Sequence, residues 1–346
     1  MYSNLFIRSM HFTQPPPTCS VEVMHDTRKL ISGVDYPATF QEFDEWFSSE
    51  EACLKFISKL RWPTGFICPD CGFHPESPSL MGRGLYLCIK CKKQTSITAG
   101  TLFHRTHKPL RIWFLAMWFV TSQKYGTSAL GLQRVLGLGS YNTAWNWLHK
   151  LRRAMVRPER DKLKGTVEVD ETYVGGVGTG VRGRGAERKS IVAIAVEVRG
   201  RGMGRIRMSV IPDVSSRSLH AFIVDSVDKG AEIRSDGWRG YNGLKKLGYS
   251  HDVANISASG DPAHAVMPRV HRVASQLDRW WLGIHQGAIR PNHLDYYLDE
   301  FTFRFNRRSS RARGLLFYRL AQLATDCSPQ NRQSIIGGKN QHVVSS

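Results

Sequence analysis

The first half of the chain carries apolar residues at helical spacing. Apolar positions three and four residues apart in segments 39–43 and 52–60 predict two short helices. Residues 110–120 are apolar almost throughout, but this stretch is too short to span a bilayer and contains Arg111, so it predicts a buried helix. From Gly165 onward the spacing changes to that of strands, which indicates a second domain of different architecture.

The second half predicts a sheet with helices around it. The predicted elements are strands over 166–170, 190–198 and 205–211, a helix over 218–227 and a short strand that ends at Asp236. Three strands in succession favour an antiparallel meander, and the helix leads into a parallel return strand. This order is typical of the RNase H-like fold. We therefore predict an α/β chain with an RNase H-like core, a mixed sheet flanked by helices.

A glycine turn separates two further helical segments, 128–136 and 141–155. Helix, turn and helix in this order predict a helix-turn-helix, in which the start of the second helix meets base edges. A buried apolar stripe on that helix leaves its first residues exposed. The predicted base contacts are Tyr141, Asn142, Thr143 and Asn146, and the predicted phosphate contacts are Lys150, Arg152 and Arg153. The alternative is an ordinary helical hairpin inside a larger domain.

Four of the seven cysteines form two close pairs. Cys68 and Cys71 are followed, after 16 residues, by Cys88 and Cys91, and Gly72 allows a tight turn after the first pair. This spacing places four thiolates around a structural Zn²⁺. The alternative is four unrelated buried cysteines. A complete set of sulfurs leaves three nearby histidines, His74, His104 and His107, without a ligand role, and the other cysteines, Cys19, Cys53 and Cys327, are predicted to be free thiols.

The charge of the chain predicts a polyanionic partner. The 346 residues carry a formal net charge of +19 and an isoelectric point near 9.9. Nucleic acid is the first candidate partner and an acidic membrane surface the second. No apolar run is long enough for a membrane span, and residues 1–20 lack the pattern of a secretory signal, so we predict no membrane association and a cytoplasmic location.

Two aspartates and a histidine form the candidate site. Asp170 and Asp236 each end a predicted strand, and His271 opens a helix-patterned run after 34 intervening residues. Two carboxylates from adjacent strand ends and a third ligand on a helix can hold two divalent cations about 3.5–4 Å apart, as phosphoryl transfer requires. The alternative for either aspartate alone is a solvated charge at the end of a strand.

Five motifs carry a specific resemblance. They span residues 169–176, 235–241, 268–275, 282–287 and 293–308. In this order they resemble the insertion-sequence transposases of the ISXO2-like branch, which combine a zinc ribbon with a DDE-type core. The similarity covers residues 36–323.

The resemblance implies a set of roles. Asp170 and Asp236 would be the catalytic carboxylates, and His271 stands where the wider superfamily has Glu, so Mg²⁺ or Mn²⁺ would be bound by two negative charges instead of three. A transposase would bind the terminal inverted repeats of its element through the zinc ribbon and helix-turn-helix, cleave the DNA ends and join them to target DNA. It would act as a homodimer or larger assembly on double-stranded DNA, associated with a bacterial nucleoid.

One position departs from the family pattern. The family places Lys seven residues after the third ligand, where this chain has Asp278, which would repel a DNA phosphate. Seven helical residues separate Asp278 from His271 by about 10 Å, too far to share one metal pair. Arg279 restores the charge only if the helix rotates. We hypothesise an attenuated copy; the alternative function is a catalytically impaired or domesticated DNA-binding protein that binds element ends and represses.

The helix predicted after residue 293 carries Glu300, Arg304 and Arg307 at i, i+4 and i+7. One interpretation is a helix ion pair between Glu300 and Arg304, with Arg307 solvated. The other follows from the resemblance: in the family these positions form a signature beside the active site, where Arg304 and Arg307 would contact DNA.

These patterns predict six segments. They are a disordered extension over 1–36, short helices over 37–66, the zinc ribbon over 67–107, the helix-turn-helix region over 108–158, the RNase H-like domain over 165–323 and a flexible tail over 324–346.

Overall fold

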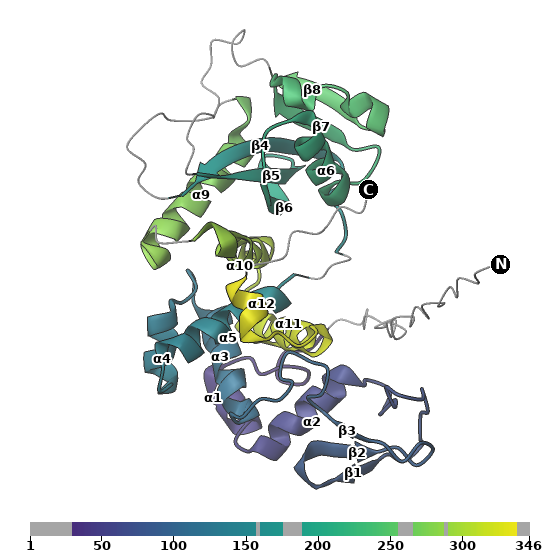
Figure 1. The fold of residues 1–346 in the computed structure, drawn as a ribbon. Helices are drawn as coiled ribbons and strands as arrows, with labels where there is room; N and C mark the ends of the chain where they lie inside the picture. The colour runs from purple at the N-terminus through teal and green to yellow at the C-terminus, as the bar shows by residue number, and fades with distance from the viewer. Residues whose placement is uncertain (1–29, 157–159, 176–188, 255–265, 287–289, 338–346) are drawn as a thin grey trace, which may run out of the picture.

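Figure 1 shows the chain as two stacked parts, with a β-sheet part above and a helical part with a small sheet below. The computed structural model describes residues 30–156, 160–175, 189–254, 266–286 and 290–337. The helical part has one hydrophobic core, and the large sheet has a core on each of its faces. Within the described part of the chain, none of the helices has the length and apolar composition that a membrane crossing needs.

The lower part is built from seven helices of the described chain. They are α1 (Phe40–Trp46), α2 (Glu50–Arg61), α3 (Leu110–Ser122), α4 (Ala129–Leu136), α5 (Tyr141–Ala154), α11 (Arg313–Asp326) and α12 (Arg332–Ile336). The predicted glycine turn is present: Gly137 ends α4 in the left-handed conformation at φ 60°, which glycine adopts without steric cost. The four cysteines lie beside a three-stranded antiparallel sheet of β1 (Ser79–Met81), β2 (Leu85–Leu87) and β3 (Gln94–Ser96).

Helix α11 belongs to the lower part and not to the RNase H-like domain, contrary to our boundary at residue 323. Phe317 of α11 is fully buried and lies 5.3 Å from the Phe43 ring and 5.6 Å from the Phe114 ring, centroid to centroid. The chain therefore returns after α10 to complete the N-terminal core. Sequence order places α11 after the sheet, but its apolar face fills the gap between α1 and α3.

Both predicted terminal extensions are partly folded. Residues 1–29 and 338–346 lie outside the described part, but Tyr36 is 5% exposed and packs on Tyr318. Gly314 permits this approach, because an added Cβ would overlap the carbonyl oxygen of Pro37. At the other end, Ile335 of α12 is fully buried. The predictions of disorder up to 36 and of a flexible tail from 324 are therefore wrong for 30–36 and 324–337, because apolar residues in both segments cover the helical core.

The upper sheet contains the four predicted strands in the predicted arrangement and a fifth strand, β8, that was not predicted. Its strands are β4 (Thr166–Val174), β5 (Ser190–Arg199), β6 (Gly202–Ile211), β7 (Glu232–Asp236) and β8 (Ser250–Ala254). Their order is β6-β5-β4-β7-β8; β4, β5 and β6 are antiparallel neighbours, whereas β7 is parallel to β4 and β8 to β7. The α/β RNase H-like prediction is confirmed. Asp170 does not end its strand, since β4 continues to Val174 in its pairing with β5.

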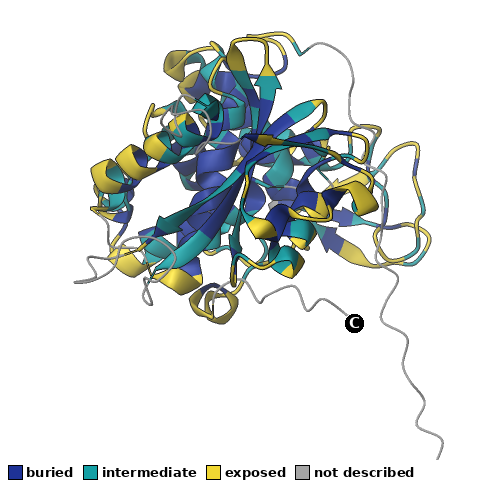
Figure 2. Cartoon of the chain, turned by 90° about the horizontal axis from the view of Figure 1, so that it is seen from above, coloured by how far each residue is buried: buried dark blue, intermediate teal, exposed yellow. Residues whose placement is uncertain are grey.

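Helices cover both faces of this sheet. Helix α6 (Ser216–Ser226) packs on one face, and α9 (Pro268–His285) and α10 (Leu294–Asn306) pack on the other. Figure 2 shows the strands dark blue between helices whose outer sides are yellow. Asn306 protects the free edge of β6: its Oδ1 accepts from the Ile206 N–H at 2.7 Å and its Nδ2 donates to the Ile206 carbonyl at 3.2 Å. Short 3-10 helices span Gly82–Gly84, Arg239–Tyr241, Leu244–Leu247 and Pro291–His293.

A buried charge triad joins the two parts. Glu300 of α10 accepts from Arg152 Nε of α5 at 2.7 Å and from Arg304 Nε at 2.9 Å, and the Arg152 and Glu300 side chains are 2% and 1% exposed. Arg304 also donates to the Gln123 carbonyl beyond α3 at 2.9 Å, and Arg152 lies 4.1 Å over the Tyr297 ring. The predicted ion pair between Glu300 and Arg304 is therefore present, whereas Arg307, predicted to be solvated, is half-buried over the Phe303 ring. The DNA contacts predicted for Arg152 and Arg304 are wrong, because both guanidinium groups are used inside the fold.

Replacing Glu300 should loosen this junction. Burial raises the pKa of the Glu300 carboxyl, but the charges of Arg152 and Arg304 outweigh burial and lower it from 4.5 to about 2. The stabilisation is therefore present above pH 4.5 and is lost as the pH falls toward 2. Glu300→Ala leaves the Arg152 charge buried and unpaired, which should reduce the free energy of unfolding by about 3–5 kcal/mol at pH 7 and weaken its dependence on acid pH.

Denaturant unfolding at several pH values measures both effects. Glu51→Ala is the matched control, because the Glu51 side chain is 76% exposed and pairs with Lys55 on the surface. We expect this control to change the free energy of unfolding by less than about 0.5 kcal/mol. Equal losses in the two variants would contradict a structural role for the triad.

Candidate active site and zinc centre

Asp170 and Asp236 lie at matching positions of two neighbouring parallel strands. The ladder between β4 and β7 pairs Glu168 with Arg234, and each aspartate is two residues further along its own strand. Because side chains in register on adjacent strands share a face, the two carboxylates point to the same side of the sheet, on strands about 4.8 Å apart. The register of β4 and β7 thus places the two aspartates on neighbouring strands at the same level, although only Asp236 ends its strand.

The face that carries these carboxylates is the one covered by α9. Val167, Val169 and Ile233 are fully buried in the core under α6. Side chains alternate along a strand, so Asp170 and Asp236 face the opposite way. His271 lies in the first turn of α9, and its Nδ1 is 3.7 Å from Asp170 Oδ2. This contact is longer than a hydrogen bond and brings the third predicted residue to the carboxylates.

Tyr241 lies beside the same carboxylates. Its hydroxyl donates to Glu171 Oε2 at 2.9 Å, and its ring is fully buried. Burial raises the Tyr241 pKa well above its usual value, and the negative charges of Glu171, Asp170 and Asp236 raise it further. One hydroxyl therefore senses three carboxylates. Neither Glu171 nor Tyr241 was predicted to be a site residue, although they lie in the motifs at 169–176 and 235–241.

Glu168 anchors the helix that carries His271. Its side chain is fully buried; Oε2 accepts from the backbone N–H groups of Arg269 and Val270 at 2.8 and 2.9 Å, and Oε1 pairs with Arg269 Nη1 at 2.8 Å. These N–H groups have no partner within the helix, and a carboxylate beside them also complements the helix dipole. Since Glu168 and Asp170 point to the same face of β4, this contact fixes His271 relative to Asp170. A glutamate between two strand valines was the available sequence signal, and we missed it.

Asp278 lies two turns beyond His271 on the exposed side of α9. Partial burial of its carboxyl raises the Asp278 pKa, and the charge of Lys189 opposes part of this rise. The neighbouring Arg279 bonds back to the Ser275 carbonyl through Nε at 3.3 Å. A DNA contact by Arg279 stays a prediction.

The predicted base-reading residues lie at the start of α5. Tyr141 and Asn142 are exposed, whereas Thr143, Asn146 and Lys150 line a pocket of about 180 Å³ together with Arg332 of α12. Burial lowers the Lys150 pKa. Helix α12 thus lies beside the exposed face of α5. The DNA contacts predicted for this face stay predictions.

The remaining predicted phosphate contacts, Arg153 at the end of α5 and Arg307 at the end of α10, lie away from the start of α5. Arg153 is half-buried; burial raises the pKa of Tyr296, and the charge of Arg153 opposes part of this rise. The Arg307 guanidinium lies 4.1 Å over the Phe303 ring. Contacts of Arg153 and Arg307 with DNA phosphates also stay predictions.

The four cysteines form a compact sulfur cluster. The Sγ atoms of Cys68 and Cys91 are 3.7 Å apart, those of Cys71 and Cys88 are 3.6 Å apart, and all four lie within 4.8 Å of one another. Four sulfurs bound to one Zn²⁺ at about 2.3 Å would be about 3.8 Å apart, so the cluster fits a structural zinc. Two histidines have other partners: His74 Nε2 lies 3.0 Å from the Thr64 carbonyl, and His104 Nδ1 accepts from the Gly100 N–H at 3.2 Å.

No second group of three potential ligands in the described residues gathers as closely as these cysteines. Asp170, Asp236 and His271 are spread more widely. A site for two cations spaces its ligands around ions about 3.5–4 Å apart, so three side chains need not surround a single ion. Two carboxylates and an imidazole are a suitable donor set for Mg²⁺ or Mn²⁺.

Removing zinc should unfold the ribbon. Because β1, β2 and β3 have only three residues each, the metal supplies much of their stability. We expect one zinc per chain by metal analysis, and we expect Cys68→Ser to lose that zinc and the order of the three strands. Cys327→Ser, at a free thiol away from the cluster, should keep the zinc. Full zinc occupancy in Cys68→Ser would contradict the assignment.

Glu168→Gln should loosen the start of α9. The amide keeps the shape but loses the charge that the two N–H groups and Arg269 share, a loss of about 1.5–3 kcal/mol. Hydrogen exchange followed by mass spectrometry should show faster exchange of the Arg269 and Val270 amides. Glu232→Gln on the neighbouring strand is the control, because Glu232 accepts from the Thr166 hydroxyl and leaves α9 untouched. Unchanged exchange in Glu168→Gln would refute the anchoring role.

Two family models match the chain. The ISXO2-like transposase domain matches residues 162–306, and the transposase zinc-ribbon domain matches residues 48–94. Together these ranges cover more than half of the 346 residues. The first range ends with α10, in agreement with the assignment of α11 to the other core.

Similar proteins were found among sequences and solved structures. The chain is 27% identical over 280 residues to an uncharacterized protein in transposable element ISH50 of Halobacterium salinarum, covering 75% of this chain and 91% of that protein. A pre-cleavage Mos1 transpososome aligns with 63% of this chain and 80% of its own at 13% identity and a TM-score of 0.17, too low to support any argument. On the two domain matches and the motifs in β4, β7 and α9, the chain belongs to the ISXO2-like transposases.

Proposed function

We propose that this transposase binds the terminal inverted repeats of its element, cleaves the DNA at the element ends and joins the freed 3′-hydroxyl to target DNA. The observation that carries the proposal is the meeting of Asp170, Asp236 and His271 on one face of the sheet, within a domain of the ISXO2-like family. Both reactions are displacements at phosphorus, and one site serves them in turn.

Asp170, Asp236 and His271 would hold the divalent cations, Mg²⁺ or Mn²⁺. When bound, such cations lower the pKa of an attacking hydroxyl and stabilise the leaving oxygen. The charges of Asp170 and Asp236 both raise the pKa of Tyr241, which supports a region of negative potential around the two carboxylates. A neutral imidazole in place of a third carboxylate reduces that field, and Mn²⁺ accepts nitrogen ligands more readily than Mg²⁺ does.

Other residues of the chain would keep the ligands in position. Glu168 holds the first turn of α9, so the imidazole of His271 stays directed at Asp170. Tyr241 donates its proton to Glu171 and stays protonated, because its pKa is raised by burial and by the nearby carboxylates. We infer that Tyr241 keeps the carboxylate of Glu171 turned away from the metal ligands.

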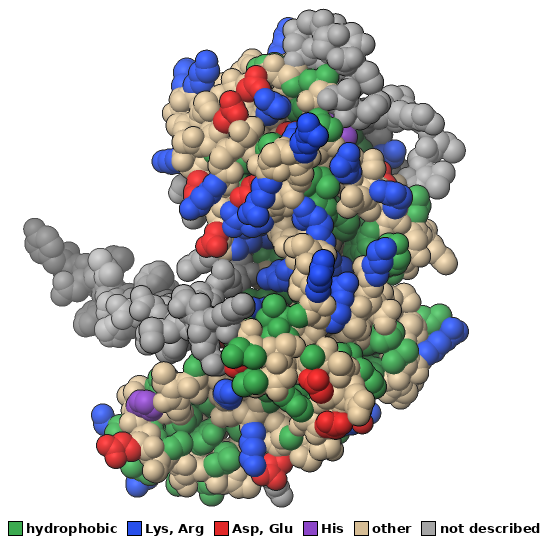
Figure 3. Space-filling view, turned by 180° about the vertical axis from the view of Figure 1, so that it is seen from behind, with side chains coloured by type: hydrophobic (Ala, Val, Ile, Leu, Met, Phe, Trp, Pro, Cys, Tyr) green, Lys and Arg blue, Asp and Glu red, His purple; other side chains and the backbone are tan. Residues whose placement is uncertain are grey.

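DNA binding is supported by charge and by the helix-turn-helix geometry. Seen from behind, Lys and Arg side chains gather over the waist between the two parts, where few acidic side chains lie (Figure 3). The exposed Tyr141 and Asn142 begin α5, the position from which base edges are read. Strand transfer requires two DNA ends held together, so we propose a homodimer or larger assembly on DNA.

Incubating labelled element ends with the protein and Mg²⁺ or Mn²⁺ tests the proposal. We expect nicking at the ends, with at least a hundredfold loss in Asp170→Asn, because the amide removes a ligand charge. Asp228→Asn is the control, since Asp228 pairs with the exposed Lys164 at 3.4 Å. Nicking that persists in Asp170→Asn would place the chemistry elsewhere.

The same assay decides on the second candidate, an impaired DNA-binding protein that represses. Asp278 favours it, because this carboxylate lies on the exposed side of α9, at the position where the family pattern has a lysine that would contact a phosphate. If the copy is attenuated, Asp278→Lys should increase strand transfer. Tight binding of the ends without nicking in either metal, in the wild type and in Asp278→Lys, would reject the enzyme and support the repressor.

A further inference from the structure

A pocket of about 290 Å³ lies at the junction of the two parts. It is lined by the end of α5, the linker that follows it, strand β6 and helices α10 and α11. Its polar lining consists mainly of arginines, Arg160, Arg205, Arg207 and Arg307, with Asp161 beside them. The volume is about ten times the roughly 30 Å³ that one water occupies in the liquid, so a hydrated polyatomic anion fits.

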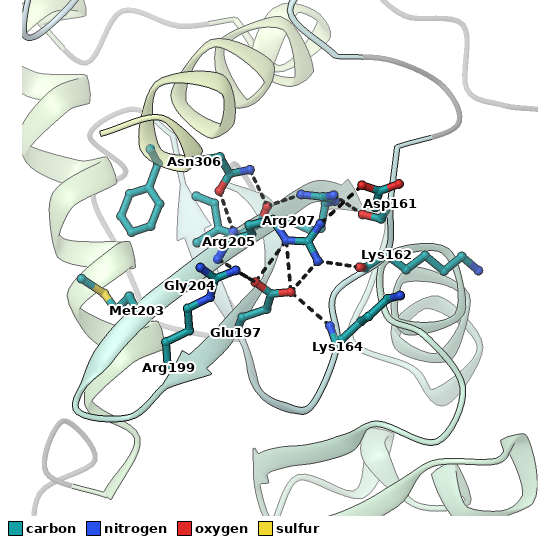
Figure 4. A network of polar contacts seen from close by, with 12 residues as sticks. Asp161, Lys162, Lys164, Glu197, Arg199, Met203, Gly204, Arg205, Arg207 and Asn306 are labelled. Carbon is teal, nitrogen blue, oxygen red and sulfur yellow. Dashed lines mark hydrogen bonds and ion pairs between the residues drawn. The ribbon is translucent and has the colours of Figure 1, made fainter. Parts of the chain in front are cut away.

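Arg207 is the most buried of these arginines. It is 4% exposed, and its guanidinium donates to two carbonyl oxygens, that of Ile206 at 2.9 Å and that of Asp161. Figure 4 shows it directed from β6 toward the linker. Among the described residues it forms no ion pair with a carboxylate. Burial, together with the charges of Arg160 and Arg205, lowers the Arg207 pKa to about 10.

The carboxylates near the pocket do not balance its arginines. Glu197 pairs with Arg205, Oε1 to Nη2 at 2.6 Å, and its other oxygen is 3.6 Å from Arg199 Nη2, so its single charge is shared between two arginines. The Asp161 carboxylate is 3.9 Å from Arg205 Nη1 and is 77% exposed to solvent.

Arg160 faces two further acids. The charges of Asp299 and Asp225 raise the Arg160 pKa, but burial has the larger effect and lowers it. Arg160 is half-buried and makes no hydrogen bond within the described chain. The pocket therefore retains excess positive charge in a partly dry setting, where an unpaired cation is costly.

We propose that this pocket binds a phosphate group, with Arg160 and Arg207 as its charged ligands. Guanidinium groups recognise phosphate oxygens through two parallel hydrogen bonds, and Arg160 has its donors available for this. The pocket lies between the helix-turn-helix and the sheet that carries Asp170. A DNA backbone that passes from one to the other would present phosphates along this path, so the inference rests on the proposed function. The same chemistry would accept free inorganic phosphate.

Two measurements on Arg160→Gln test the proposal. The first is the affinity for an element-end duplex as a function of salt. Loss of one phosphate contact should reduce the slope of log K against log salt by about 0.9. Arg160→Lys keeps the charge and should keep the slope, and Arg217→Gln on the exposed side of α6 is the control for a lost surface charge. The second is the shift in melting temperature of each variant in inorganic phosphate relative to chloride at equal ionic strength.

The outcomes distinguish a DNA phosphate from free inorganic phosphate. They also distinguish failure of the pocket inference from failure of the proposed function. A reduced slope in Arg160→Gln alone supports a DNA phosphate in the pocket. A phosphate-dependent rise in melting temperature that Arg160→Gln abolishes, with an unchanged slope, supports free phosphate instead. Neither effect, in a wild type that binds the duplex, overturns the inference and leaves the proposed function intact. A wild type that does not bind the duplex rejects the proposed function itself.

Discussion

The buried carboxylate of Glu300 is the interaction on which the arrangement of the two parts depends. It is bound by Arg152 from α5 and by Arg304 from its own helix, and Arg304 reaches on to the carbonyl of Gln123. Gly126 lies so close that an added Cβ would be 2.7 Å from Glu300 Oε1. Burying ions costs several kcal/mol each unless every one is paired. The triad is satisfied in one relative position of the helical part and the sheet, and it thereby fixes α5 relative to α10.

The same device recurs at two other places in the fold. Glu168 joins β4 to α9, and Glu197 joins the β5–β6 hairpin to the linker through Arg205 and the Lys164 N–H. Each buried glutamate accepts from both an arginine and at least one backbone N–H, or from two arginines, so both of its oxygens are used. Each also connects segments far apart in sequence. Charge pairs of this kind fix orientation more than they add stability, and the candidate site needs fixed orientation because its ligands come from three separate elements.

Local patterns predicted the local features. The cysteine spacing predicted the sulfur cluster, strand periodicity predicted four of the five strands of the large sheet, and Asp170, Asp236 and His271 were chosen from their motifs. Contacts between distant segments were not predictable in this way. No periodicity indicates that α11 crosses back to the first core, and a glutamate in a strand does not reveal that its partner is a helix N-terminus about a hundred residues later. A single sequence holds the residues of such a pair but not their proximity.

The buried arginines show why the net charge of the chain overstates the number of cations available to DNA. Arg152, Arg304 and Arg269 bind buried glutamates and carbonyl oxygens, and Arg205 does the same at the linker. These charges count toward the formal net charge of +19, yet they are held inside the fold and release no counterions when DNA binds. The salt dependence of DNA binding should therefore reflect far fewer phosphate contacts than the net charge suggests. It depends on the cations that make no hydrogen bond to a carboxylate within the described chain, and for this reason a half-buried guanidinium such as Arg160 is more informative about the path of DNA than the total charge of the chain.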